Sequence, residues 1–167
     1  LTAFANIGQG YHSNDARGAT ISIDPVSGEA TEPAPLLVKS LGYEAGVNYT
    51  DNKTYNVSAA LWRLELDSEL VYVGDAGFTE ASRPSERHGI EVSAYYWISH
   101  HLTTDIEAAW TKARFSDRVE GEGRHIDGTV PGVVSAGLTY YQQSNQLGFS
   151  YTLRGRYLSS RTVESFD

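Results

Sequence analysis

The residues with the clearest potential for metal binding or proton transfer lie in one short run, "SHHLTTD". It places His100 and His101 just before Asp105, and imidazole and carboxylate groups together can hold a metal ion or share a proton. The spacing matches no zinc-binding pattern, and the run coincides with a predicted short turn. We therefore interpret both histidines as solvated turn residues, and we expect no metal site and no cofactor.

Other reactive groups are scarce in the 167 residues. The absence of cysteine excludes a disulfide framework, a zinc–thiolate site and a thiol nucleophile. Glu91 and Glu107 would supply the two carboxylates of a glycoside hydrolase, but nothing around them favours that chemistry, and the motif G-x-S-x-G does not occur. The formal net charge of −8 argues against nucleic acid as a partner, because such partners need a basic surface. We expect a protein that is not an enzyme.

Two polar segments carry candidate ligand-binding residues. His12, Asn14, Asp15 and Arg17 open the first segment, and Arg124 and His125 lie together in a later one. Exposed loops often bind ligands, so these groups could meet an iron chelate or another small molecule. The alternative, which we favour for the first group, is that Asn and Asp shape the start of the loop through hydrogen bonds to their own backbone.

Such residues need elements to position them, and the hydrophobic pattern predicts long β-strands. In "LGFSYTLRGRYL" (147–158) the positions of Phe149, Tyr151 and Leu153 alternate with those of Thr152 and Arg154, which puts the two sets on opposite faces of a strand. Similar alternation predicts strands over 1–11, about 38–50, 55–66, 88–98, 102–115, 133–141 and 147–158.

The third predicted strand changes phase. Its apolar positions shift from Leu61 to Trp62, which indicates either a bulge or two apolar faces. The segment 69–74 extends this strand after a kink near Asp67.

The strand lengths and connections favour a membrane barrel. Soluble strands average about 5–6 residues, whereas a tilted membrane strand needs about 9–11. Long polar segments at 12–36, 75–87 and 116–131 alternate with short turns at 51–54, 99–101 and 143–146, as extracellular loops and periplasmic turns do in outer-membrane barrels. A short hairpin at "ATISID" is expected inside the first segment. Aromatic residues near the short turns fit an interfacial girdle: Tyr49, Tyr55, Trp97, Tyr140, Tyr141 and Phe149.

The medium that each face contacts stays open at this point. In a barrel the apolar faces meet lipid, and the charged residues of the polar faces line the lumen, where they could pair with each other or with a plug. These residues are Glu44, Glu91, Asp105, Glu107, Arg154 and Arg156. In a soluble β-sandwich or lipocalin-like binding module, the same charges form an ordinary solvated face.

Four stretches carry a family resemblance. "FANIGQGYHSNDARG" (4–18), "LELDSELVYVGDAG" (64–77), "RHGIEVSAYYWI" (87–98) and "IDGTVPGVVSAGLTYY" (126–141) resemble, in that order, barrel stretches of TonB-dependent outer-membrane receptors. Each motif is short and moderately specific, and the ordered combination covers nearly the whole chain.

The resemblance implies an all-β chain, 1–167, that forms about seven strands of a larger antiparallel transmembrane barrel in the bacterial outer membrane. It implies uptake of a scarce nutrient, such as a ferric siderophore, cobalamin or another metal complex, coupled to TonB. The implied partners are membrane lipid, a plug domain, the remaining barrel strands, a metal chelate, and TonB through a part absent here. Because seven hairpin-linked strands leave the first and last parallel, we expect an open sheet with unpaired edges at 1–11 and 147–158.

Overall fold

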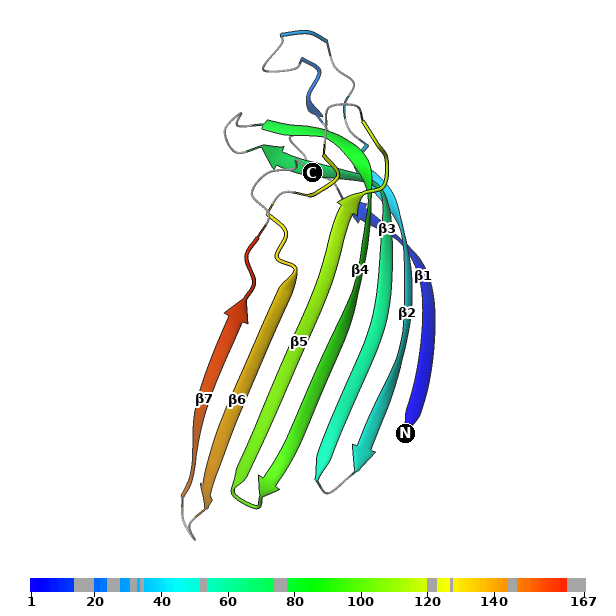
Figure 1. Ribbon diagram of the computed structural model, residues 1–167. Helices are drawn as coiled ribbons and strands as arrows, with labels where there is room; N and C mark the ends of the chain where they lie inside the picture. Colours follow the sequence, from blue (N-terminus) through cyan, green and yellow to red (C-terminus); the bar gives the residue numbers. More distant parts are fainter. Residues whose placement is uncertain are drawn as a thin grey trace.

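Seven antiparallel strands make up the fold (Figure 1). The computed structural model describes residues 1–13, 20–23, 28–30, 33, 35–51, 54–73, 78–119, 123–126, 128–143 and 147–161. The strands are β1 (Thr2–Ser13), β2 (Leu37–Asp51), β3 (Tyr55–Val73), β4 (Phe78–Ser99), β5 (Leu102–Phe115), β6 (Gly132–Gln143) and β7 (Gly148–Leu158). Among the described residues, no helix is long and apolar enough to cross a membrane. The predicted all-β class is confirmed.

Each strand pairs with its neighbour in the chain, so the sheet order is β1-β2-β3-β4-β5-β6-β7. Within the described residues β1 and β7 do not pair with each other, and the predicted open sheet is confirmed. In the described part of the expected hairpin at "ATISID", Ile23 forms an isolated bridge with Ala30. That bridge adds no strand to the sheet.

The connection between β3 and β4 differs from the prediction. The segment 75–87 was expected to be a loop, but β4 begins at Phe78 and pairs with β3 up to Val73. The regular alternation of long and short connections therefore fails here, because a long hairpin replaces the second long loop. Its polar composition resembles that of a loop, and only the pairing with β3 makes it a strand.

The irregularity in β3 lies where the kink was expected. Pairing is unbroken from Tyr55 to Leu66 and then shifts between Leu66 and Glu69. Pro84 sits opposite this shift, between the partners of those two residues, and a proline is tolerated there because it has no N–H to give to the ladder. The change of phase at Trp62 therefore arises because this part of β3 carries apolar residues on both faces, and no bulge lies there.

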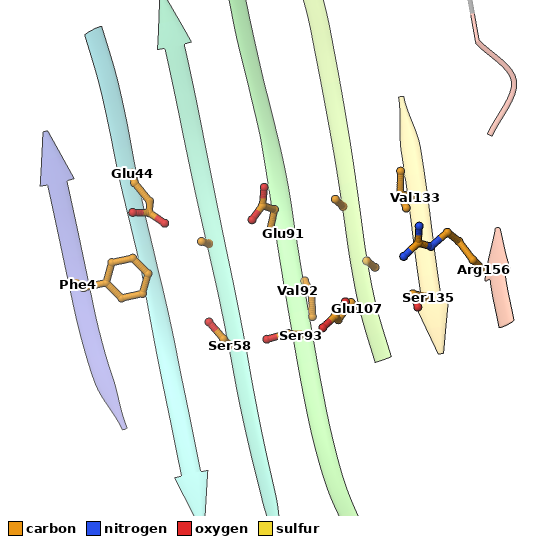
Figure 2. A pocket seen from close by; sticks show the side chains of 13 residues that line it. Phe4, Glu44, Ser58, Glu91, Val92, Ser93, Glu107, Val133, Ser135 and Arg156 are labelled. Atoms are coloured by element: carbon orange, nitrogen blue, oxygen red, sulfur yellow. The ribbon is translucent and has the colours of Figure 1, made fainter. Parts of the chain in front are cut away.

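The two faces of the sheet differ in chemistry. We call the face that carries Glu44, Glu91 and Glu107 the concave face, because it encloses a hollow (Figure 2), and the other the convex face. We call the residues paired side by side across neighbouring strands a rung. On the convex face five consecutive rungs, from Leu102 to Trp110 along β5, form an apolar band. It includes Val47, Leu61, Ile90, Ile106, Trp110, Val134, Leu138, Tyr140, Tyr151, Leu153 and Tyr157.

The apolar band packs against nothing in the described structure. Leu61 and Trp110 are each 61% exposed, and Leu153 is 78% exposed. The buried apolar residues are few, and most lie at the end of the sheet that holds the 116–131 connection, which we call the loop end: Val38, Leu66, Phe115 and Ile126. The opposite end, with the turns after β2, β4 and β6, is the turn end (Figure 1).

Candidate functional site

The concave face holds a hollow of about 450 Å³ that spans the sheet (Figure 2). Small side chains on the central strands leave the space open: Ser58, Ala60, Ser93, Ala109 and Ser135. Charged side chains project into it from four strands, with Glu44 on β2, Glu91 on β4, Glu107 on β5 and Arg156 on β7. The hollow is therefore mainly acidic, with one arginine near its β7 side.

Several of these charges have no partner of their own. The Nδ2 of Asn6 donates a hydrogen bond to Glu44 at 3.0 Å. In the part of the chain that the structure describes, Glu91, Glu107 and Arg156 take part in no hydrogen bond or ion pair. Two carboxylates and one guanidinium group thus remain available to another molecule or domain that enters the hollow.

One ion pair crosses the concave face toward the turn end. The Nη2 of Arg154 lies 2.9 Å from Oδ1 and 2.8 Å from Oδ2 of Asp105, and its Nη1 donates to Ser135 at 3.3 Å. The pair links β7 to β5 across β6 at Gly137, where an added Cβ would lie 2.7 Å from the Asp105 carboxylate. The bare backbone of Gly137 thus leaves room for the side-chain ends that tie β7 to β5.

All six charged residues predicted on the polar faces lie on the concave face. Only Asp105 and Arg154 pair with each other. The sequence pattern placed the residues on one side of the sheet, but it gave no information about which would meet.

Aromatic rings cover three glycines that are their direct cross-strand partners. Phe4 lies over Gly46 and Trp62 over Gly89 on the concave face, and Trp110 lies over Gly132 on the convex face; the pairs follow the register of the sheet. An aromatic ring shields the backbone that a glycine leaves bare. Within the described chain, the indole Nε1 of Trp62 is buried without a hydrogen-bond partner. None of these contacts was predicted, although the register would have brought them together.

A network of charges lies at the loop end, outside the apolar band. Arg63 contacts Glu65 at 2.8 Å and Glu86 at 3.0 Å, and Glu86 also accepts a hydrogen bond from Arg114. The hydrogen bond from Arg114, followed by the positive charges around it, lowers the pKa of the Glu86 carboxyl below its usual value, against the opposing effect of burial. This carboxylate therefore stays ionised between the two arginines.

Another arginine, Arg83, anchors the connection after β5. Arg83 lies over the Phe115 ring at 4.4 Å, contacts Asp117 at 2.9 Å and donates to the carbonyl of Gly123 at 3.0 Å. Its side chain is only 15% exposed. The β3–β4 hairpin is thereby joined to the start of the long connection.

The structure describes three of the six residues predicted to bind a ligand. Arg124 donates from Nε to the carbonyl of Phe115 at 3.0 Å, and its own carbonyl accepts from the Phe115 N–H at 2.8 Å, so it holds the connection against β5. His125 is exposed, and its backbone forms an isolated β-bridge with Arg114. His12 is exposed near the end of β1. Asn14, Asp15 and Arg17 lie outside the described residues.

His100 and His101 lie in the turn between β4 and β5. The Nδ1 of His101 lies 3.1 Å from the carbonyl oxygen of Tyr141, and both His100 and His101 are exposed. No group of three or more His, Asp or Glu side chains in the described residues could hold a metal ion.

The aromatic residues near these turns divide between the faces. Tyr49 stacks on Tyr55 at 5.4 Å, and both lie on the convex face. Trp97 packs against Tyr95 at 4.3 Å on the concave face, where Tyr141 also lies. The predicted girdle of aromatic residues therefore lacks Trp97 and Tyr141.

Comparison with protein families accounts for this arrangement. The family model "TonB dependent receptor-like, beta-barrel" matches residues 1–167. The chain belongs to the TonB-dependent receptor β-barrel family. No curated protein matches the chain. An open antiparallel sheet with one apolar and one polar face is consistent with a segment of such a barrel.

Proposed function

We propose that the chain forms part of the wall of an outer-membrane receptor that takes up a scarce nutrient by TonB-coupled transport. The nutrient class that we propose is a metal complex, such as a ferric siderophore or cobalamin. In this arrangement the convex face contacts lipid and the concave face lines the lumen. The observation that carries the proposal is the exposed apolar band, because exposure of so large an apolar surface to water is energetically unfavourable.

The height of the band supports a membrane location. From Leu102 to Trp110, β5 covers about 27 Å at about 3.4 Å per residue, or about 20 Å across the membrane at a tilt of about 40°. Outer-membrane barrels carry a band about 25 Å tall. The alternative of a soluble β-sandwich or lipocalin-like module gains no support, since its apolar side chains would pack into a core, whereas Trp110 and Leu153 are exposed.

We propose that the lumen surface receives the receptor's plug domain. Glu91, Glu107 and Arg156 are available for it, because none has a partner among the described residues. Asp105 and Arg154 already form an ion pair with each other. They would therefore stiffen the barrel wall and not bind the plug. TonB would engage a part of the receptor outside this chain.

Ligand contact is proposed for the loop end, from His12, His125 and the predicted residues Asn14, Asp15 and Arg17. The backbone contacts of Arg124 support a role in holding the connection after β5, so its contribution to ligand binding would be indirect.

Transport by the complete receptor tests the proposal. We expect cells that lack the receptor gene to lose energy-dependent uptake of a radiolabelled metal complex, tested across a panel of ferric siderophores and cobalamin. Restoring the gene should recover uptake, and collapse of the proton gradient should abolish it. Unchanged uptake of every member of the panel in the deletion strain would contradict the proposed nutrient class.

Sidedness is tested separately. We expect the loop end to lie outside the cell and the turn end in the periplasm. An epitope tag inserted after Gly128 should bind antibody on intact cells, whereas one after His100 should bind only once the outer membrane is permeabilised. The reverse pattern would invert the proposed orientation.

A further inference from the structure

A row of basic side chains lies directly beyond the apolar band on the convex face. Arg63, His88 and Lys112 are paired side by side across β3, β4 and β5. Each lies two residues beyond a member of the loop-end rung of the band, Leu61, Ile90 and Trp110. On β3, β4 and β5 the side chains of this face therefore change within one rung from apolar to basic.

Two of the three side chains in this row are not engaged by a carboxylate of the described residues. The adjacent rung supplies two carboxylates, Glu65 and Glu86, which are engaged by Arg63 and Arg114. His88 and Lys112 are exposed, and neither forms a hydrogen bond or ion pair with any residue that the structure describes. The row therefore offers N–H donors that face outward.

We propose that this row, Arg63, His88 and Lys112, binds the phosphate group of a membrane lipid whose acyl chains lie along the apolar band. The proposal rests on the membrane location proposed above. Cationic N–H groups form strong, charge-assisted hydrogen bonds with phosphate. The ligand is assigned to a lipid rather than a free anion because the donors adjoin exposed Leu61, Ile90 and Trp110, a junction that matches the headgroup and chains of an amphiphile.

Direct titration of the complete receptor tests this site. The purified receptor, freed of lipid in a neutral detergent, is titrated with phosphatidic acid and with phosphatidylcholine of the same acyl chains, and bound lipid is counted by native mass spectrometry. We expect tighter binding of phosphatidic acid. The double variant His88→Gln/Lys112→Gln, which leaves the contacts among Arg63, Glu86 and Arg114 in place, should bind it about tenfold more weakly.

Two matched variants isolate the role of the row. Lys112→Arg keeps the charge and should retain binding. Arg118→Gln removes an exposed cation beyond the end of β5 and should bind like the wild type. If the double variant does not reach the folded form seen by heat-modifiable gel mobility, Lys112→Gln alone should still weaken binding about threefold.

The outcomes separate this proposal from the one on which it rests. Equal affinities of the wild type and the His88/Lys112 variant for phosphatidic acid would overturn the lipid site. Competition by inorganic phosphate at equal concentration would show a free-anion site and would also overturn it. Absence of the wild-type receptor from the outer-membrane fraction would instead contradict the proposed function.

Discussion

Arginine at position 108 is expected to remove most of the folded receptor from the outer membrane, whereas arginine at position 109 should leave its level close to wild type. Ala108 lies on the convex face, one rung from the middle of the apolar band, and Ala109 lies on the concave face, paired with Glu91. An arginine facing lipid near the midplane costs about 2–4 kcal/mol. This corresponds to roughly a 30- to 1,000-fold loss in the folding equilibrium.

Neighbouring residues with the same side chain provide the control. Ala108→Arg and Ala109→Arg add the same volume and charge to one strand, so only the face differs. Ala59→Arg and Ala60→Arg repeat the comparison on β3, where Ala60 also lines the hollow. The measurement is the fraction of heat-modifiable, folded receptor in outer-membrane fractions. Equal loss for both members of each pair would contradict the assignment of the convex face to lipid.

Replacing Gly89 with alanine is expected to destabilise the barrel by about 1–3 kcal/mol, the usual cost of overpacking. A Cβ at this position would lie 2.9 Å from Cζ2 of Trp62 and would also meet the backbone carbonyl of Trp110. Backbone cannot move aside as the end of a flexible side chain can, so β4 and β5 would have to separate or the Trp62 ring would have to turn.

Gly8 offers the matched control, because it lies on the concave face of β1 and an added Cβ would meet nothing within 4 Å. Gly8→Ala should therefore leave stability unchanged or raise it slightly, as loss of backbone freedom in the unfolded chain predicts. The midpoint of urea unfolding, measured for receptor reconstituted in vesicles, separates the two variants. A shift of the same size for both would show that the contact with Trp62 is not the cause.

Strand positions were predictable because a period of two leaves a strong signal when one face is apolar. The pattern located all seven strands and separated residues such as Phe149 and Tyr151 from Thr152 and Arg154. It failed for the start of β4. In "TEASRPSER" the alternation is absent, and the strand depends on pairing with β3 and on the contacts of Arg83 with the connection after β5, none of which local composition reveals.

The candidate site was predictable by face but not by contact. Asp105 and Arg154 are 49 residues apart, and their meeting depends on the register of three strands and on the bare backbone of Gly137. The hydrogen bonds of Arg124 to the carbonyls of Phe115 and Ser116 were not predictable either. Whether a polar loop residue turns inward or outward depends on packing that a single sequence does not encode in any local pattern.

The strictly sequential order of the sheet has a consequence for how such a wall can change in size. In the described structure every strand from β1 to β7 bonds only to its neighbours in the chain, so two adjacent strands can be gained or lost as a unit. Duplication or deletion of one hairpin would preserve the direction of every other strand and would require only one new ladder, between the strands that become neighbours. Loss of a single strand would reverse the direction of every strand that follows it in the chain. Evolution can therefore widen or narrow this architecture in steps of two strands, which agrees with the even strand numbers of bacterial barrels.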